Sequence, residues 1–549
     1  MFILVLEAVA LYGFSWTLWK ICRRFFAKSP LDNIPGPPPK SIWKGVFSQV
    51  FNVDGWNFHR EMAEKYGRVI KLTALFGESQ LYVFDPKALH HIVVKVGQFT
   101  MPSYFSNPCV KDQYIYEETS SFIEGNRLMF GHGLLGTLGE QHRKQRKMLN
   151  PVFSIAHMRD MVPTFYNVTY KLRDAFVSRV QNGPREIEVL SWMTRTALEL
   201  VGQSGFGFSF DPLTDDGVPH PYSTAAKRLV PVSFKMLFPR TYLLATLVKI
   251  GTPSFRRFLV DLIPWKALHD LRDVVDVLHN TSVEIIESKK KALAEGDESV
   301  AHQIGQGKDI LSILLKANMT ASEADKLSEE EMLGQMSTLT FAAMDTTSSA
   351  LSRILWLLAN HQGVQDKLRA EVREARKQGD LVYDDLVNLP YLDAIPTCLC
   401  PLKNDIVLPL GAPIKGVDGR EIHEIPIPNN TNVIISILAS NRNPEVWGPD
   451  SYDWKPERWL QPLPDTVIQA HIPGIYSHLM TFLGGGRACI GFKFSQLEMK
   501  VVLSILVASF KFSPSDKEIM WKMNGIATPT TADNETVLPR LPLMVELAA

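Results

Sequence analysis

A single cysteine near the carboxyl end of the chain stands in a setting suited to metal binding. Cys489 follows three consecutive glycines, Gly484 to Gly486, and Gly491 comes two residues after it. Glycines allow the backbone to curve tightly around the sulfur, and a helical pattern from Phe492 to Phe510 begins directly beyond. The positive end of a helix stabilises a thiolate, the form of cysteine that binds metals. A lone cysteine is usually a small buried hydrophobe, but this setting predicts a metal ligand.

An acid and an alcohol lie side by side in a predicted helix and form a second candidate site. Ser328, with Glu331 three residues later, has the pattern of a capping box, which predicts that a long helix begins there. Asp345, Thr346 and Thr347 fall inside that helix. Neighbouring threonines compete with the hydrogen bonds of a helix backbone. Their placement beside an aspartate therefore needs an offsetting reason, such as a chemical role for the pair.

Two basic residues four positions apart form a third candidate. His142 and Arg146 share one face of a helix predicted through Glu140 to Arg146. A solvated basic face accounts for the same pattern, so both interpretations stay open.

The elements that must position these residues are mostly helical. Strand-like runs occur at 69–72, 80–83 and 432–435, whereas helical periodicity dominates from about residue 150 to Ala375. The polar, glycine-containing stretch from Lys289 to Lys308 is typical of a mobile surface loop. We expect one mainly α domain with small β-sheets.

The cysteine loop resembles the haem-binding signature of the cytochrome P450 family. The match covers five fixed positions: Phe482, Gly485, Arg487, Cys489 and Gly491. The resemblance implies a cytochrome P450-like fold that binds haem b, with Cys489 as the axial thiolate. It also implies that Arg487 pairs with a haem propionate and that Phe482 packs beside the sulfur. Because an anionic sulfur favours cleavage of dioxygen bound to iron, the implied reaction is monooxygenation.

The other two candidates also resemble parts of this family. The segment around Asp345 and Thr346 is similar to the oxygen-binding helix, in which an acid and a threonine deliver protons to oxygen. Ala343 stands where the family usually has glycine, which adds one methyl group near the oxygen pocket. His142 stands where tryptophan is more common, and the resemblance implies that it and Arg146 reach a propionate. The similarity extends from residue 35 onward and is closest to fungal microsomal members.

One segment of the family pattern is missing from the sequence. A helix with a glutamate and, three residues later, an arginine should follow Ala394, but Pro396 and Pro401 oppose a helix there. The resemblance implies that Arg458 loses its partner glutamate, and an unpaired buried cation costs about 3 to 5 kcal/mol. We therefore expect either an exposed Arg458 or a weakened domain. The apparent deletion, near residues 396–405, looks like a misassigned exon, although a real deletion would leave a catalytically impaired haem protein.

The amino terminus predicts a membrane anchor. Residues 2–19 are apolar except for Glu7, Ser15 and Thr17, and as a helix they would span about 27 Å. Cations follow at once, which places the rest of the chain in the cytoplasm. We expect an anchor at 1–22, a basic, proline-rich linker at 23–40 and the catalytic domain at 41–549, on the endoplasmic reticulum membrane. Glu7 keeps an ordinary buried helix as the alternative.

Charge and composition limit the partners. The chain has 58 Lys plus Arg and 58 Asp plus Glu, so its formal net charge is zero. This balance implies no positive electrostatic field that would attract nucleic acid. The absence of a Gly-x-Gly-x-x-Gly fingerprint means that electrons must come from another protein, and the resemblance implies an NADPH-cytochrome P450 reductase. The expected substrate is an apolar small molecule of fungal secondary metabolism, such as a terpenoid.

Membrane lipid is a further partner through the anchor, and the apolar stretch from Val230 to Ile250 is either core or a lipid-facing access region. A haem-thiolate isomerase or dehydratase that needs no electrons is the remaining alternative, and the Asp345–Thr346 pair weighs against it.

Overall fold

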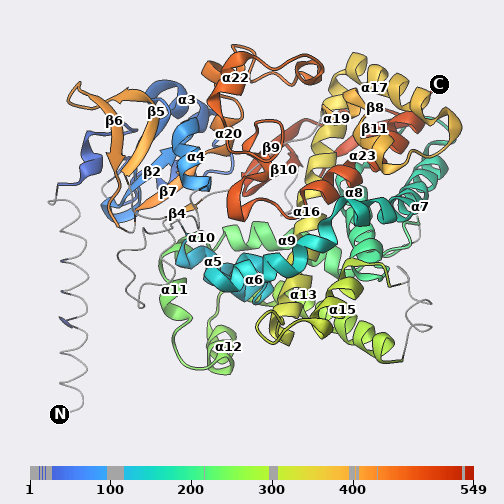
Figure 1. The fold of residues 1–549 in the computed structure, drawn as a ribbon, viewed down its shortest axis with the longest axis horizontal. Helices are drawn as coiled ribbons and strands as arrows, with labels where there is room; N and C mark the ends of the chain where they lie inside the picture. The colour runs from blue at the N-terminus through green and yellow to red at the C-terminus, as the bar shows by residue number, and fades with distance from the viewer. Residues whose placement is uncertain are drawn as a thin grey trace. The chain divides into compact units, whose positions relative to one another are not determined.

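The computed structural model (Figure 1) describes residues 28–41, 43–94, 117–214, 217–295, 307–394, 402–403, 407–429, 431–533 and 538–549, with four single residues nearer the amino terminus. The predicted anchor at 1–22 therefore lies almost wholly outside the described residues, as do most of the expected loop after Glu295 and the stretch 395–401. Within the described part of the chain, every helix is too short or too polar to cross a membrane.

Contacts divide the chain into two compact units, and each is considered by itself. The first comprises Met1–Thr119, Thr397–Trp454 and Leu463–Cys489. The second comprises Ser120–Pro396, Lys455–Pro462 and Ile490–Ala549. The prediction of a single catalytic domain from residue 41 stays a prediction.

The first unit is built on a four-stranded sheet. Its strands lie in the order β1 (Val69–Thr73), β2 (Ser79–Val83), β7 (Asn432–Ile435) and β4 (Leu402–Lys403). The three predicted strands are thus present, β1 antiparallel to β2 and β2 parallel to β7. Successive side chains of a strand point to opposite faces, and the face that carries Ile70, Leu72 and Tyr82 packs with Met62 of α3 (Trp56–Tyr66) in a small core.

The remaining elements of the first unit are short. They are η1 (Pro30–Asn33), α2 (Phe47–Val50), η2 (Leu75–Gly77), α4 (Pro86–Val94), the hairpin of β5 (Val407–Lys415) and β6 (Glu421–Pro426), α20 (Ile437–Ser440), α21 (Pro444–Trp447), α22 (Asp465–Ala470), η9 (Met480–Phe482) and η10 (Gly485–Arg487). α4 packs against η10, which carries the start of the cysteine loop.

The second unit holds the long helices. They are α5 (Ser120–Phe130), α6 (Gly139–Leu149), α7 (Ile155–Val180), α8 (Val189–Val201), α9 (Pro221–Phe234), α10 (Leu237–Tyr242), α11 (Leu244–Leu247), α12 (Pro253–Leu262), α13 (Lys266–Glu295), α15 (Ile310–Thr320), α16 (Glu329–Asn360), α17 (Gln362–Ala375), α18 (Tyr383–Val387), α19 (Pro390–Asp393) and α23 (Phe492–Ser509). Single turns η4 (Leu134–Gly136), η5 (Asn150–Phe153), η6 (Gly202–Phe206), η7 (Arg376–Gln378) and η8 (Pro456–Leu460) connect them. Two small sheets complete the unit: β3 (Arg185–Glu188), β11 (Pro542–Leu547) and β8 (Phe510–Pro514), and the hairpin β9 (Ile519–Asn524) with β10 (Ile526–Thr531). The mainly α fold with small sheets is confirmed.

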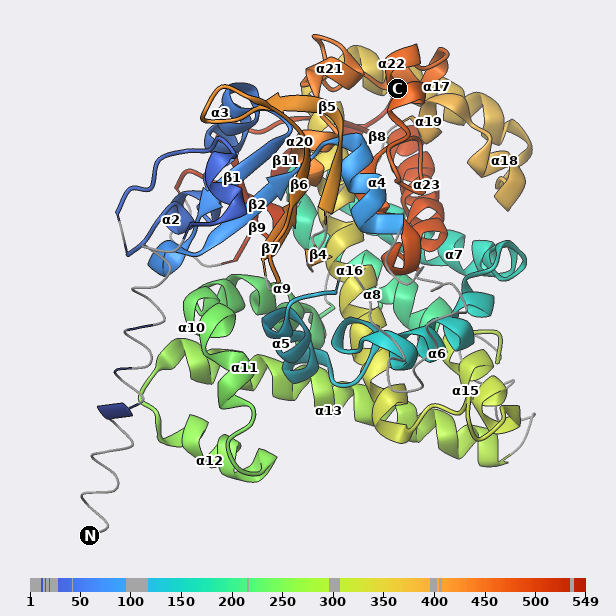
Figure 2. The same cartoon turned by 60° about the vertical axis from the view of Figure 1, so that its left-hand side comes forward.

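Helix α16 is the central helix of this unit, and its start follows the predicted capping box. The Glu331 backbone N–H donates to Ser328 Oγ at 3.2 Å, and the Ser328 N–H donates back to the Glu331 carboxylate at 2.8 Å. Two otherwise unpaired groups are thereby satisfied at once. Figure 2 shows α16 running between α8 and α13, and the helix also contacts α5, α9 and α23.

Candidate active site

The cysteine loop is closed by its own backbone. The Cys489 N–H donates to the Phe482 carbonyl at 2.9 Å, and the Ala488 N–H donates to the Gly485 carbonyl at 3.2 Å. Gly485 has φ +61°, and a Cβ there would lie 2.1 Å from the carbonyl oxygen of Val93 in α4. The curve of the loop and the close approach of α4 thus both require glycine at this position.

The Cys489 sulfur lies on the accessible side of this loop. Cys489 is exposed and forms no disulfide with another described residue, and a Cβ placed on Gly486 would meet nothing within 4 Å. Phe482 is half-buried, with its ring 6.5 Å from the ring of Tyr476 at an angle of 77°.

Arg487 already has a carboxylate partner in the first unit. Its Nε lies 2.7 Å from Oε1 of Glu118, and the two side chains are only 13% and 10% exposed. Burial raises the pKa of Glu118, while the positive charge of Arg487 acts in the opposite direction. A haem propionate at Arg487 would have to share the guanidinium with Glu118. The predicted propionate contact stays a prediction, and Glu118 is a residue that the sequence did not single out.

Asp345 and Thr346 point to different surroundings on α16. Thr346 is exposed, and its hydroxyl donates to the Ala342 carbonyl at 2.6 Å. Asp345 is buried, and its Oδ1 accepts a hydrogen bond from Lys227 Nζ at 2.5 Å. Adjacent residues of a helix project about 100° apart, because 3.6 residues make one turn. The acid is therefore held against a neighbouring helix while the alcohol faces open space.

Lys227 is the functional candidate that sequence reasoning missed. It lies on α9, is 9% exposed, and also donates to Ser348 Oγ at 2.9 Å. Removing one member of a buried ion pair leaves an uncompensated charge and costs about 3 to 5 kcal/mol. Lys227 is 118 positions before Asp345, so only the packing of α9 on α16 could reveal the pair.

His142 and Arg146 lie on α6 as expected. Both are half-buried, and both make interactions with other groups. Their neighbours Arg143 and Lys147 are instead largely exposed, at 62% and 67%. The solvated basic face of this helix is thus formed by Arg143 and Lys147. Contact of His142 or Arg146 with a propionate stays a prediction.

Of the two outcomes expected for Arg458, an exposed side chain is wrong and a weakened domain stays a prediction. Arg458 is half-buried but does interact with other groups, so the cost of an isolated cation does not arise there. In the same region, the Tyr391 and Leu392 N–H groups both donate to the Glu371 carboxylate at 2.9 Å and so hold α19. Lys367 and the Tyr391 hydroxyl pair with Glu457, which lowers the pKa of Glu457 to about 2.

The unsatisfied group near the missing helix is Glu498 on α23. Glu498 is fully buried, and no hydrogen-bond partner for either carboxylate oxygen occurs in the described part of the chain. Burial raises its pKa well above the ordinary value of 4.5. α23 packs against α17, α18 and α19, which directly precede the expected deletion. The buried carboxyl group of Glu498 thus lacks a polar partner among the described residues of the helices around α23.

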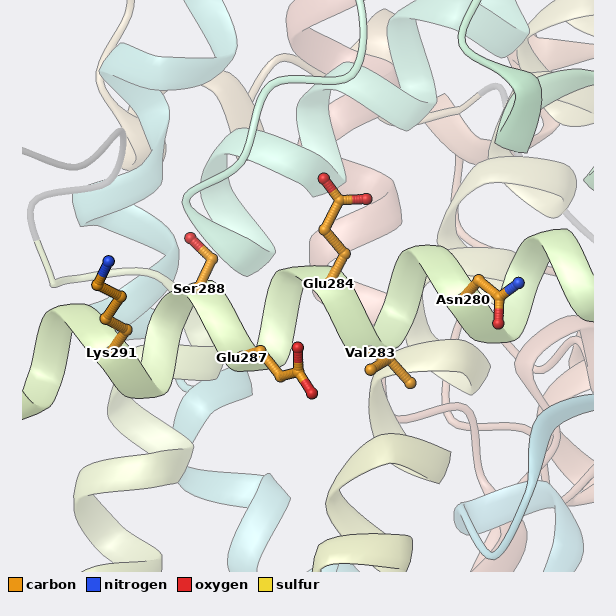
Figure 3. A pocket seen from close by; sticks show the side chains of 6 residues that line it. All are labelled: Asn280, Val283, Glu284, Glu287, Ser288 and Lys291. Atoms are coloured by element: carbon orange, nitrogen blue, oxygen red, sulfur yellow. The ribbon is translucent and has the colours of Figure 1, made fainter.

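Two hollows on the surface of the second unit are lined by residues other than the candidate residues. Figure 3 shows one of about 480 Å³, whose lining side chains spread along α13 and do not converge: Asn280, Val283, Glu284, Glu287, Ser288 and Lys291. Another, of about 610 Å³, lies between α6 and the start of α16 and is lined mainly by charged residues. Neither includes Asp345 or Thr346.

The donor set fits an iron held by one protein ligand. In the part of the chain that the structure describes, no three His, Cys, Asp or Glu side chains are grouped so as to hold a metal ion. A bare ion in a structural or catalytic site would need such a group. An accessible cysteine on a glycine loop instead suits a metal whose other ligands come from a macrocycle.

Comparisons with known proteins agree with this geometry. The family model described as Cytochrome P450 matches residues 35–534. Cytochrome P450 monooxygenase 91 of Postia placenta is 53% identical, over 99% of this chain and 98% of that protein. Cytochrome P450 monooxygenase 81 of the same fungus is 47% identical, over 96% and 95%. Ganoderic acid synthetase CYP5150L8 of Ganoderma lucidum is 42% identical, over 99% of each chain.

Proposed function

The chain belongs to the cytochrome P450 family of monooxygenases, and we propose that it inserts one oxygen atom from dioxygen into an apolar terpenoid-like molecule. The observation that carries the proposal is the accessible sulfur of Cys489 on its glycine loop. Haem b, when bound, would supply an iron that activates dioxygen. Cys489 would hold the iron, and Arg487, His142 and Arg146 would hold the propionates.

The residues of α16 would control protons. The Thr346 hydroxyl now donates to the Ala342 carbonyl, so it must rotate to donate towards a ligand on its open side. The Asp345 carboxylate is bonded to Lys227, and it can pass a proton to Thr346 only after that ion pair separates and the carboxylate has taken up a proton from solvent. We infer that Lys227 holds Asp345 in its resting position.

The relatives support the choice of substrate class. One protein similar over its whole length is named ganoderic acid synthetase, after a terpenoid acid. An oxygenase for such a molecule needs an apolar site of substantial size. The identity of the terpenoid and the position that is oxidised would be read from product analysis.

An exposed apolar surface supports a membrane location. From α10 to the start of α13, the side chains of Phe238, Leu243, Leu247, Ile250, Phe255, Phe258, Leu262, Ile263 and Trp265 are each 39–62% exposed. Exposed apolar patches of this kind mark interaction sites, and the cations Arg256 and Arg257 lie among them. We propose that this segment touches the endoplasmic reticulum membrane, together with an anchor at 1–22, and that the catalytic domain faces the cytoplasm.

An assay of product formation with and without the reductase and NADPH tests the proposal. Membranes that contain the full chain and an NADPH-cytochrome P450 reductase are supplied with triterpenoids, NADPH and ¹⁸O₂. We expect a product that carries one ¹⁸O atom and depends on the reductase. Product formed without NADPH would identify an isomerase or dehydratase instead. The Thr346→Ala variant should consume NADPH while forming less product, because its proton donor is missing.

A catalytically impaired haem protein is the second candidate, and the buried, unpartnered Glu498 favours it. In that case the chain would bind haem weakly and form no product under the same conditions. Sequencing the cDNA across Ala394 to Asp405 distinguishes a misassigned exon from a real deletion.

A further inference from the structure

Arg240 on α10 has an unusual environment for a cation. Within the described residues, its guanidinium has neither a hydrogen bond nor an ion pair, although the side chain is partly covered by protein. Burial lowers its pKa, and no nearby carboxylate opposes this effect. A desolvated cation without a partner is costly, so a ligand that supplies an anion would be favoured here.

The other arginines of this segment are satisfied. Arg257 bonds both oxygens of Asp276 at 2.8 and 2.6 Å, and Arg256 donates to the Gly251 carbonyl at 2.8 Å. Arg272 bonds Asp261 at 2.8 Å. Arg240 lies in the same part of the chain as these arginines, but its guanidinium lacks a comparable partner among the described residues.

The stem of Arg240 crosses helix α5 at its glycine. A Cβ placed on Gly125 would lie 3.5 Å from Arg240 Cδ and 3.7 Å from a methyl of Leu244, so the arginine stem lies within contact distance of this point of α5. Both α10 and α11 pack on α5. The Arg240 side chain is thus packed along its stem and is half-buried as a whole.

Helix α5 connects Arg240 to the acid-alcohol pair. Its last residue, Phe130, packs on Phe341 of α16 with ring centroids 4.9 Å apart. Gly125 to Phe130, and Phe341 to Thr346, each cover five residues, or about 7.5 Å of helix at 1.5 Å per residue. Helix α5 therefore packs both on α10, which carries Arg240, and on α16, which carries Thr346.

We propose that Arg240 binds the carboxylate of an elongated apolar acid and so makes the enzyme selective for acids over neutral molecules. A guanidinium can bind a carboxylate through two parallel hydrogen bonds. The inference rests on the proposed function, because it names the substrate class of that same site. It requires a carboxylate at one end of the molecule and oxidation at the other.

Binding of a matched pair of probes to the haem-loaded full chain tests this role. The probes are oleanolic acid and its methyl ester, which differ only in the charge at one end, and the haem absorption band reports binding. A charge-assisted hydrogen bond contributes about 1.5–3 kcal/mol, so the wild type should bind the acid about tenfold or more tightly than the ester. Arg240→Gln should abolish this preference and leave ester binding unchanged, whereas Arg240→Lys should keep part of it. Arg256→Gln, in the same segment, is the control and should keep all of it.

Three outcomes would overturn the inference. The first is equal binding of acid and ester by the wild type, and the second is an equal loss of both in Arg240→Gln, which would mean that the stem only packs. The third is an unchanged acid preference together with weaker binding to phosphatidylserine vesicles, which would assign Arg240 to lipid. If the wild type gave no thiolate-type haem spectrum, the proposed function would fail separately, and equilibrium dialysis of the two probes would still test Arg240.

Discussion

Replacing Lys227 with methionine tests the most unexpected contact at the candidate active site. Methionine keeps an unbranched, flexible stem but removes the charge that pairs with Asp345 at 2.5 Å. Asp345 would then be a carboxylate only 3% exposed, with no cation beside it. Breaking a buried pair in this way costs about 3 to 5 kcal/mol. Each kcal/mol lowers the melting temperature of a large domain by about 2 to 4 °C.

The expected loss is therefore at least about 6 °C in thermal unfolding of the haem-loaded protein, followed by circular dichroism. Lys227→Met combined with Asp345→Asn should recover much of the loss, because no unpaired charge remains. Lys266→Met is the matched control. It also removes a Lys–Asp pair, with Asp270 at 2.8 Å, but Lys266 is 86% exposed and its loss should not change the melting temperature measurably.

The reasoning would be refuted if Lys227→Met melted with the wild type. It would also be refuted if the double variant lost the sum of the two single losses, because that result means that the two residues do not interact.

Three further predictions concern the cysteine loop and the region of the expected deletion. Gly485→Ala should abolish haem incorporation, because the new Cβ would lie 2.1 Å from a backbone oxygen. Gly486→Ala should retain haem, because its Cβ would meet nothing within 4 Å. The haem content per protein measures both variants, and equal contents would contradict this reasoning. Burial raises the pKa of Glu498 in the folded chain. The free energy of unfolding should therefore fall as the pH rises above the pKa that Glu498 has in the unfolded chain, by up to about 1.4 kcal/mol per pH unit. Denaturant unfolding at several pH values should show this loss in the wild type and not in Glu498→Gln, and parallel pH profiles would show that Glu498 has a partner. Glu118→Gln should raise haem content, because it removes the carboxylate that competes with a propionate for Arg487. A lower haem content would mean that the ion pair itself builds the loop.

Local rules were sufficient to predict the elements but not the contacts between them. The capping box at Ser328 and the strand at 432–435 follow from neighbouring residues, and the structure contains both. The loop at Cys489 was predicted because glycine and cysteine types at fixed spacing identify it without tertiary information.

Contacts between distant residues could not be predicted in this way. Lys227 and Arg240 look like ordinary surface cations in the sequence, and only the packing of α9 on α16 and of α10 on α5 makes one a buried partner and the other an unpaired cation. Arg458 likewise makes interactions that its neighbours in the sequence do not reveal. The sequence did offer a signal for Glu498, which is an acid in the strongly apolar helix that ends at Ser509, and this signal was overlooked.

The central claim is that the Cys489 sulfur binds haem iron as a thiolate. The most direct measurement is the carbon monoxide difference spectrum of the reduced, purified full chain, beside its Cys489→Ser variant. The wild type should give the red-shifted band of a thiolate-bound haem, and the serine variant should not. An identical spectrum from both proteins would contradict the assignment of Cys489 as the ligand.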